Sequence, residues 1–262
     1  MLLDAHVHLD HYADGKEIRE VMQEIENEKI FTIAVAMDEA SYKRTLKRAE
    51  RQPFVLPAFG IHPWEAPKHS RHMESFLPLL EKTPMIGEIG LDHRFVKESE
   101  LWPAQRKVLE FFLAEAKRQK KLVNLHTTGA EGEAAALLEE HDIERAIVHW
   151  YNGPEDVFQR LAARGYHFSF GVELRTSPHI QTLARACPAA QLLTETDNPG
   201  AAKHLFGQQG RPKMIGGVVR DLAAARGVQP QDMVAQVAAN FARLIQDDPH
   251  MGAARKFFPK PE

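Results

Sequence analysis

The sequence has little cysteine, no long apolar run and a small net charge, and each of these shortages excludes a class of protein. Cys187 is the single cysteine among 262 residues, so an intramolecular disulfide and a disulfide-stapled scaffold are excluded. No stretch of about 18 apolar residues occurs, so we expect no membrane-spanning helix. The opening residues Met1–His6 lack a basic stretch followed by an apolar run, so we expect no signal peptide and a cytoplasmic protein.

Charge and composition also restrict the class of function. The net charge is −3, so the strongly basic body that is usual in high-affinity nucleic-acid binding is absent. This observation does not exclude a nuclease, because metal ions can supply positive charge at a site. Apolar residues make up 44% and charged residues 26% of the chain, which is typical of a globular protein with a large core.

Short apolar runs alternate with longer amphipathic stretches along the whole chain. The apolar runs are mostly rich in Val, Ile, Leu and Phe, as expected for strands of a parallel sheet that is covered on both faces. Strands are predicted over Leu2–His8, Phe31–Ala36, Phe54–Gly60, Met85–Gly90, Leu122–His126, Ala146–His149, His167–Gly171 and Gln191–Glu195. Helices are predicted over Glu17–Glu28, Trp102–Gln119, Gly132–His141, Pro154–Arg164, Pro178–Ala186, Lys213–Ala225 and Gln231–Gln246.

This alternation predicts an α/β protein, a TIM (β/α)8 barrel, with an open doubly wound sheet as the less favoured alternative. No Gly-rich phosphate loop follows any predicted strand, which disfavours a Rossmann or P-loop protein. No linker rich in Gly, Ser or Pro interrupts the pattern, so we expect one domain over residues 1–262. The polar, Gly-containing segment Pro199–Pro212 is predicted to be a long loop after the last strand.

Ionisable side chains gather where the predicted strands end. His6 and His8 lie two residues apart in the first strand, so their side chains point to the same side. Two satisfied core histidines are the alternative interpretation of that pair. The C-terminal ends of barrel strands converge around one mouth, so ligands from several strands can meet there. The candidate metal ligands are His6, His8, Glu88, His126, His149 and Asp197.

Six ligands are more than one tetrahedral ion requires, and they suit two divalent ions that share a bridging carboxylate. Imidazole and carboxylate ligands fit Mg²⁺, Mn²⁺ or Zn²⁺ and do not decide between them. Two such ions about 3.5–4 Å apart can activate a water molecule and hold the attacking and leaving oxygens of a phosphate ester. The predicted cofactor is therefore a pair of divalent ions.

These motifs, in this order and spacing, resemble the TatD family of metal-dependent deoxyribonucleases. The likeness spans nearly the whole chain, and its specificity comes from the combination of the pieces. The matching pieces are Asp4–Asp10, Gly60–Pro63, Gly87–Asp92, Gln105–Arg106, Leu125–His126, Val148–His149, Glu195–Pro199 and Ala239–Leu244.

The resemblance implies a division of the ligands between two ions. One ion would be bound by His6, His8 and Asp197, and the other by His126 and His149. The implied activity is hydrolysis of DNA phosphodiester bonds, often from the 3′ end of single strands.

Glu88 and Asp197 are the candidate catalytic residues. Glu88 would bridge the two ions, as the resemblance implies. Asp197 would lie beside the attacking water, where a carboxylate can serve as general base.

His62 and Arg94 are candidates for binding a substrate phosphate. His62 ends the third predicted strand and either contacts phosphate at the mouth or caps a turn before Pro63. Arg94 can bind phosphate oxygens with its guanidinium group. The alternative is that the acidic neighbour Asp92 forms a salt bridge with a basic side chain.

Trp150 and Tyr151 directly follow His149, and an aromatic ring at the mouth can stack on a nucleobase. Packing under a loop is the commoner role for such residues. Where family members often read Ser-Arg-Asp-Ala after the fifth strand, this chain reads Thr127–Ala130 after His126. A cationic side chain is therefore missing there, which leaves the candidate ligands intact and the substrate open.

Three hypotheses follow. The first is a deoxyribonuclease with single-stranded DNA as its substrate and no membrane partner. The second is a metal-dependent amidohydrolase or phosphotriesterase-like hydrolase of small molecules, although Glu88 stands where many of those enzymes carry a modified lysine. The third is a TatD-like subunit of a multi-protein assembly, because His8–Tyr12 resembles a TatD branch associated with bacterial anti-phage gene clusters. The sequence identifies no protein partner.

Overall fold

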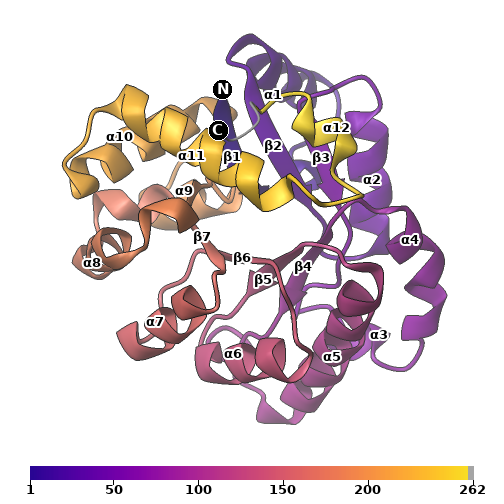
Figure 1. Cartoon of the computed structure of the whole chain (residues 1–262). Coiled ribbons are helices and arrows are strands. Elements are labelled where there is room, and N and C mark those ends of the chain that lie inside the picture. Colours follow the sequence, from indigo (N-terminus) through magenta and orange to yellow (C-terminus); the bar gives the residue numbers. More distant parts are fainter. Residues whose placement is uncertain (259–262) are drawn as a thin grey trace.

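The computed structural model describes residues 1–258, in which eight parallel strands alternate with helices (Figure 1). The strands begin and end within two residues of the predicted runs, because buried apolar runs bounded by polar loops mark parallel strands well. The strands are β1 (Leu2–Val7), β2 (Ile30–Val35), β3 (Val55–Ala58), β4 (Ile86–Gly90), β5 (Val123–His126), β6 (Ala146–His149), β7 (His167–Phe170) and β8 (Leu192–Thr194).

The barrel wall consists of two groups of parallel strands, β1–β2–β3 and β4–β5–β6–β7–β8. Parallel bridges join the groups on both sides, between Phe59 and Ile86 and between Val7 and Asn198. The amide of Asp197 also donates a hydrogen bond of 2.9 Å to the carbonyl of His6. The eight strands therefore follow one another around a (β/α)8 barrel, and the predicted fold is confirmed.

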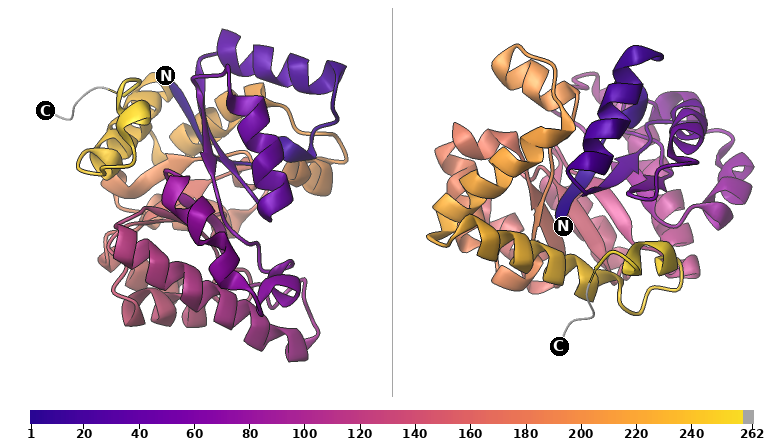
Figure 2. Two further views of the ribbon diagram at one scale, coloured as in Figure 1. Left: turned by 90° about the vertical axis from the view of Figure 1, so that its right-hand side faces the viewer. Right: turned by 90° about the horizontal axis from the view of Figure 1, so that it is seen from above.

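Helices surround the barrel, as the views in Figure 2 show. Two of them, α5 and α8, have the predicted bounds, because a proline in the first turn marks where each begins. The helices are α1 (Lys16–Asn27), α2 (Glu39–Ala49), α3 (Ala66–His69), α4 (Leu77–Lys82), α5 (Trp102–Gln119), α6 (Glu131–Glu140), α7 (Glu155–Ala163), α8 (Pro178–Ala186), α9 (Gly200–Phe206), α10 (Ile215–Arg226), α11 (Pro230–Ile245) and α12 (Gly252–Arg255).

The prediction of a long loop over Pro199–Pro212 was wrong. Helix α9 occupies its first half and ends at Gly207, whose left-handed backbone (φ 70°) terminates the helix. The helix buries only small side chains, Ala201 and Ala202, so its apolar stripe is too weak to be read from the sequence.

The C-terminal segment covers the N-terminal end of the barrel. The ring of Phe31, at the start of β2, lies 5.8 Å from Phe241 and 5.1 Å from Phe258. Arg145, just before β6, forms a 3.0 Å ion pair with the buried carboxylate of Asp248. The right-hand view of Figure 2 shows α11 and α12 beside the N-terminus. The C-terminal segment therefore packs over this end of the barrel.

Glycines in β4 let its neighbouring strands approach closely. A Cβ on Gly87 would lie 2.6 Å from the Cβ of Asn124 on β5, closer than side chains pack. A Cβ on Gly90 would overlap the carbonyl oxygen of His126, and the backbone of Gly90 (φ 154°) is one that other residues rarely adopt. These contacts hold Glu88, which lies between the two glycines, against β5.

Substitution of Gly90 tests this close approach. We expect Gly90→Ala to lower the free energy of unfolding by about 1–3 kcal/mol, because β4 and β5 must separate to admit the methyl group. Gly216→Ala is the control: it lies in α10 with no atom within 3.7 Å of the added carbon, and should stabilise by about 0.5–1 kcal/mol. Urea denaturation measures both, and equal stability of Gly90→Ala and the wild type would contradict the packing argument.

A half-buried histidine at the start of β7 makes stability depend on pH. Burial, reinforced by Arg243, lowers the pKa of His167 to about 4, below the ordinary value of about 6.5. The unfolded chain therefore takes up the proton first as the pH falls. The stability contribution of neutral His167 is complete above about pH 6.5 and is lost as the pH falls toward about 4.

Between about pH 7 and pH 5, His167 should cost the wild type up to about 2 kcal/mol of its free energy of unfolding. We expect His167→Leu not to show this part of the loss. Urea unfolding at each pH gives the difference, and His72→Leu, at an exposed histidine, serves as the control. The same loss in the wild type and in His167→Leu would show that this group does not set the acid sensitivity.

Candidate metal centre

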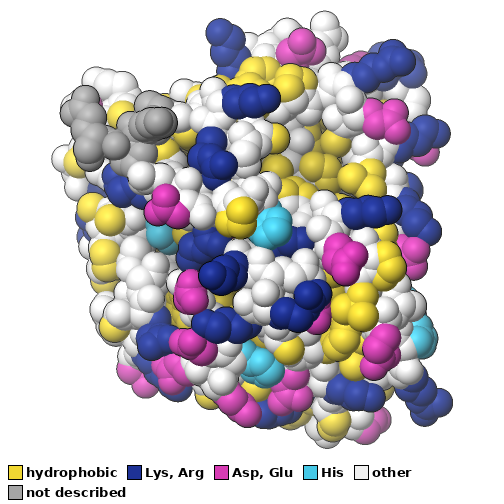
Figure 3. Space-filling model, turned by 45° about the vertical axis from the view of Figure 1, so that its right-hand side comes forward, with side chains coloured by type: hydrophobic (Ala, Val, Ile, Leu, Met, Phe, Trp, Pro, Cys, Tyr) yellow, Lys and Arg dark blue, Asp and Glu magenta, His cyan; other side chains and the backbone are white. Residues whose placement is uncertain are grey.

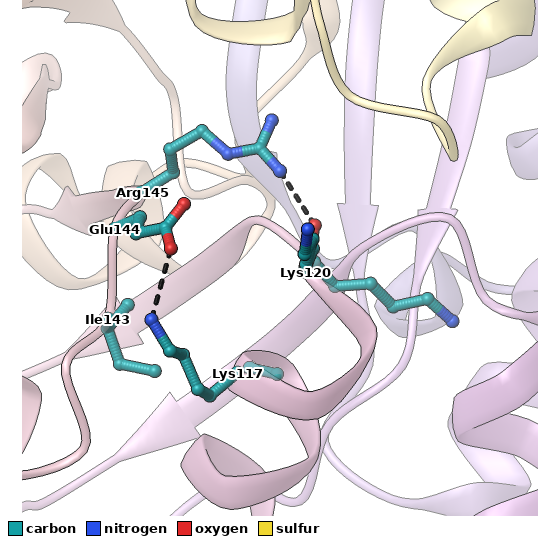
Figure 4. A pocket seen from close by; sticks show the side chains of 7 residues that line it. Lys117, Lys120, Ile143, Glu144 and Arg145 are labelled. Atoms are coloured by element: carbon teal, nitrogen blue, oxygen red, sulfur yellow. Dashed lines mark hydrogen bonds and ion pairs between the residues drawn. The ribbon is translucent and has the colours of Figure 1, made fainter.

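A cavity of about 370 Å³ opens at the C-terminal ends of the strands. Its lining includes His8, His62, Glu88, His126, His149 and Asp197. A second hollow, at the N-terminal ends of β5 and β6, has only about 20 Å³, roughly the space of one water. Figure 4 shows that second hollow bridged by an ion pair between Lys117 and Glu144 and by Arg145 bound to the carbonyl of Lys120. The large cavity is therefore the candidate site.

The two carboxylate oxygens of Glu88 face two different groups of side chains. Oε2 lies 3.4 Å from Nε2 of His6 and 3.3 Å from Nε2 of His8. Oδ1 of Asp197 lies 3.5 Å from the same nitrogen of His8 and 3.8 Å from that of His6. His6, His8 and Asp197 thus form one cluster of possible ligand atoms around Oε2.

The second cluster surrounds Oε1 of Glu88. This oxygen lies 2.8 Å from Nδ1 of His126 and 2.9 Å from Nε2 of His149. Nε2 of His62 approaches the same oxygen at 3.5 Å. The structure therefore brings all six predicted ligands to one mouth, on the two sides of the Glu88 carboxylate, with the rings of His6 and His149 stacked 3.7 Å apart between them.

The ring of His6 is oriented by Asn124, a residue that sequence reasoning missed. The side-chain amide of Asn124 donates to the carbonyl of Ala5 at 2.9 Å, so its oxygen faces Nδ1 of His6 at 2.8 Å. His6 therefore carries a proton on Nδ1, which leaves Nε2, on the side of Glu88, as the atom that can bind a cation. A signal existed, because Asn124 precedes His126 by two residues in β5 and points to the same side.

Two further carboxylates lie behind the second cluster. Oδ2 of Asp92 lies 3.3 Å from Nε2 of His126, on the far side of the ring from Glu88. Oε1 of Glu195, the residue directly after β8, lies 3.7 Å from Nδ1 of His149. Ser169 donates to the other oxygen of Glu195. Such partners fix the tautomer and the orientation of ligating histidines.

The electrostatics of the site follow from these contacts. Burial alone would raise the pKa of Glu88, but the surrounding histidines, His62 foremost, outweigh it and hold that pKa well below its usual value. Burial alone would lower the pKa values of His126 and His149, but the neighbouring carboxylates raise both. Protons on the histidines thus balance the buried carboxylate.

Divalent cations fit this cluster better than protons do. Oε2 of Glu88 is buried and, within residues 1–258, accepts no hydrogen bond, a costly condition that a cation relieves. Four groups of ligand atoms also lie close enough to share an ion: His6–His8–Glu88, His62–Glu88–His126, His6–His149–Glu195 and His8–Asp10–His11. A cation would neutralise Glu88 and leave the histidines as uncharged ligands, releasing their protons.

His62 differs from the other histidines in its protonation. The backbone amide of Trp64 donates to Nδ1 of His62 at 3.2 Å, so the neutral ring carries its proton on Nε2, toward Glu88. Burial lowers the pKa of His62 to about 4, which keeps the ring neutral. His62 is therefore a hydrogen-bond donor into the cavity, as a phosphate contact requires.

Arg94 lines the cavity and does not pair with Asp92. Its guanidinium group donates to the side chain of Asn152 at 3.2 Å, near the surface. Asp92 instead accepts hydrogen bonds from the indole of Trp64 at 2.6 Å and from two backbone amides. Within residues 1–258 the basic side chain that pairs with Asp92 is thus His126, at 3.3 Å, and Arg94 stays a candidate for phosphate binding.

The two aromatic residues predicted to stack on bases have different positions. Trp150 lines the cavity, with its indole hydrogen-bonded to Glu173. Tyr151 is buried, packs against Phe158 and donates its hydroxyl proton to the carbonyl of Pro154 at 2.7 Å. The structure thus brings Trp150 to the mouth of the cavity. Tyr151 instead packs under the loop, which was the alternative to stacking on a base.

A (β/α)8 barrel with histidines and carboxylates converging at the C-terminal ends of its strands defines a class, the barrel hydrolases that depend on metal ions. The chain belongs to one family within that class: the model of the TatD related DNase family matches residues 3–246. The expected membership and the expected enzyme class, a metal-dependent hydrolase, are thereby confirmed.

Relatives cover the chain nearly from end to end. Deoxyribonuclease TATDN3 of Homo sapiens is 27% identical over 95% of this chain and 96% of its own length. The uncharacterized metal-dependent hydrolase YjjV of Escherichia coli K12 is 30% identical over 91% of this chain and 95% of its own length.

Solved structures give the same result for the fold. The crystal structure of YjjV, a TatD homologue from Escherichia coli K12, superposes with a TM-score of 0.84 and 26% identity, covering 93% of this chain and 97% of that one. A TatD family hydrolase from Entamoeba histolytica shares the fold with a TM-score of 0.79 at 17% identity, covering 93% of this chain and 97% of that one. No helix in residues 1–258 is both long enough and apolar enough to span a membrane.

The orienting role of Asn124 can be tested through metal affinity. We expect Asn124→Ala to weaken divalent-metal binding by about 10- to 100-fold, because the ring of His6 loses the group that fixes its tautomer. Competition against a chromogenic chelator measures the affinity. Asn152→Ala, at the rim of the cavity, is the matched control and should bind metal as the wild type does. Equal affinity of Asn124→Ala and the wild type, with both folded, would refute the role.

Proposed function

We propose that this protein is a two-metal phosphodiesterase that degrades single-stranded DNA from the 3′ end. The observation that carries the proposal is the division of ligands around Glu88, whose two oxygens face separate clusters. A carboxylate shared between two groups of imidazole and carboxylate ligands is the arrangement that a pair of divalent ions needs. The printed name of the human relative, deoxyribonuclease TATDN3, supports DNA as the substrate.

Each candidate ligand receives one role in this proposal. His6, His8 and Asp197 would hold one ion, His126 and His149 would hold the other, and Glu88 would be shared between them; the ions would be Mg²⁺, Mn²⁺ or Zn²⁺. When bound, such ions supply positive charge that stabilises the phosphate in the transition state and lowers the pKa of water.

The remaining chemistry falls to side chains of the chain itself. The carboxylate of Asp197 is partly exposed to the cavity (18% of the side chain), so it can accept a proton from the attacking water. Nε2–H of His62 donates to a phosphate oxygen, and the low pKa of that ring keeps it a neutral donor. Arg94 contributes a fixed positive charge at the rim.

The shape and charge of the molecule support a single strand as substrate. A cavity of about 370 Å³ at the end of the barrel can take the end of an unpaired strand, whereas a duplex would first have to be opened at a cost of a few kcal/mol. On the face drawn in Figure 3, basic and acidic side chains lie interspersed. We therefore expect affinity to come from contacts at the mouth more than from a general attraction to DNA.

Hydrolysis of 3′-labelled single-stranded DNA tests the proposal. With added Mg²⁺, Mn²⁺ or Zn²⁺ the wild type should release nucleotides one at a time, and elemental analysis should find two ions per chain. Glu88→Gln and Asp197→Asn should each lose more than about 100-fold in kcat, because each removes negative charge from the ion cluster. Glu65→Gln, a carboxylate outside the cluster that pairs with Lys68, is the control and should retain activity.

Two results would overturn parts of the proposal. Metal-loaded wild type that releases nothing from DNA, while it hydrolyses an amide, lactone or phosphotriester, would move the function to the small-molecule hydrolases. A single ion per chain with full activity would remove the two-metal mechanism and leave the substrate intact.

A further inference from the structure

Two aromatic side chains are exposed at the mouth of the cavity, beside the candidate metal centre. Trp64 is 46% exposed and Phe95 is 58% exposed. Within residues 1–258 the large hydrophobic side chains that are exposed are Met1, Leu46, Trp64, Phe95 and Val228. Only the two aromatic ones line the cavity. Aromatic surface left open beside an active site is typical of a ligand-binding surface.

The two rings form a corner. Their centroids lie 6.1 Å apart and their planes are inclined by 70°, so the edge of one ring meets the face of the other. A flat molecule that lies on one ring would have its edge against the second ring. The corner therefore suits a planar aromatic ligand of limited size, such as a nucleobase.

One buried carboxylate anchors both residues. The indole Nε1–H of Trp64 donates to Oδ2 of Asp92 at 2.6 Å, and the backbone amide of Phe95 donates to Oδ1 at 2.9 Å. Asp92 is fully buried and is itself held by Gln105, which bonds to its backbone amide and carbonyl. The corner is thus fixed before a ligand arrives, which lowers the entropic cost of binding.

The same carboxylate connects the corner to the candidate metal centre. Oδ2 of Asp92 also faces Nε2 of His126 at 3.3 Å. The ring of His62, which approaches Glu88, packs edge-on against the indole of Trp64 with centroids 4.8 Å apart. The aromatic corner therefore borders the place where the scissile phosphate would be held.

Charge next to the corner fits a nucleotide rather than an apolar ligand. Arg94 directly precedes Phe95 and lines the same cavity, with its guanidinium group bound to Asn152. On the other side of Phe95, the ring of His204 from α9 lies 6.5 Å away. An aromatic surface beside a cationic side chain matches a base and its attached phosphate.

We propose that Trp64 and Phe95 form a base-stacking corner that receives one unpaired base of a single-stranded DNA substrate, with Arg94 on a phosphate beside it. The proposal rests on the proposed function and names the contact that would give it strand selectivity. A base within a duplex has both faces covered by its neighbours, so only an unpaired or frayed base can enter the corner. Trp64 and Phe95 are then specificity-determining residues for the same reaction.

Equilibrium binding tests the corner without requiring turnover. The probe is a fluorescein-labelled, phosphorothioate-linked oligothymidylate, which resists hydrolysis, titrated with metal-loaded protein in a fluorescence anisotropy assay. Phe95→Leu keeps apolar bulk but removes the ring, and it should raise the Kd at least about fivefold. Phe95→Tyr keeps an aromatic ring and should bind as the wild type does. Trp64→Leu should weaken binding similarly, and Leu46→Ala, an exposed apolar residue on α2 outside the cavity lining, should not.

A second probe carries one abasic tetrahydrofuran residue at successive positions. At one position the missing base should raise the Kd of the wild type at least about fivefold relative to the intact probe. In Phe95→Leu, which lacks the stacking ring, the abasic probe and the intact probe should bind with the same Kd. Where the enzyme is active, Phe95→Leu should raise KM for single strands and leave kcat unchanged. A fully paired duplex should bind to the wild type and to Phe95→Leu equally.

The outcomes separate this inference from the proposed function. If the wild type binds the single strand but Phe95→Leu and Trp64→Leu bind it equally well, the corner is refuted and the nuclease proposal stands. If the wild type binds with the predicted dependence on Phe95 but never hydrolyses DNA, the corner stands and the nuclease proposal fails. Equal loss of duplex and single-strand binding in Phe95→Leu would also refute the corner.

Discussion

The carboxylate of Glu88 is the group around which the whole site is organised. It is buried at the C-terminal end of β4, within hydrogen-bonding or ion-pairing distance of histidines from four other segments of the chain. An isolated buried carboxylate would cost several kcal/mol or would take up a proton. The protein retains the charge because imidazoles surround it, and the same imidazoles are the ligands that divalent ions prefer.

Strand packing makes this arrangement possible. Gly87 and Gly90 flank Glu88 and leave no Cβ between β4 and β5, so Asn124 and His126 come into contact with that strand. The barrel then brings β1, β6 and the turn after β8 to the same mouth. The site is therefore a consequence of close backbone packing as much as of the candidate ligands themselves.

A second layer of polar groups fixes the ligands in place. Asn124 orients His6, and Asp92 lies behind His126. Asp92 also receives the indole of Trp64, so one buried carboxylate serves both a candidate ligand and the aromatic rim. A change at Asp92 would therefore act on His126 and on the aromatic rim together, which links the candidate metal centre to the proposed base-stacking corner.

The strands and the candidate ligands could be predicted from the sequence because both depend on local order. A buried strand is a short apolar run, and a residue two positions from His6 or at the end of such a run must point toward the mouth. The helices α2 and α9 could not be predicted so well. α2 is largely polar and begins with a capping interaction between Asp38 and Ser41, and α9 buries only alanines.

The amino-acid order by itself determined the barrel, its strand ends and the six candidate ligands that converge there. These features follow from hydrophobic periodicity and strand direction, which depend on residues that are close together in the sequence. Only the tertiary structure decided which oxygen of Glu88 faces which histidines, that Tyr151 is packed away, and that Trp64 and Phe95 stand open at the rim. Those features depend on contacts between residues far apart in the chain. The directions of these side chains are set by the packing of strands and loops, which cannot be predicted from a short stretch of sequence.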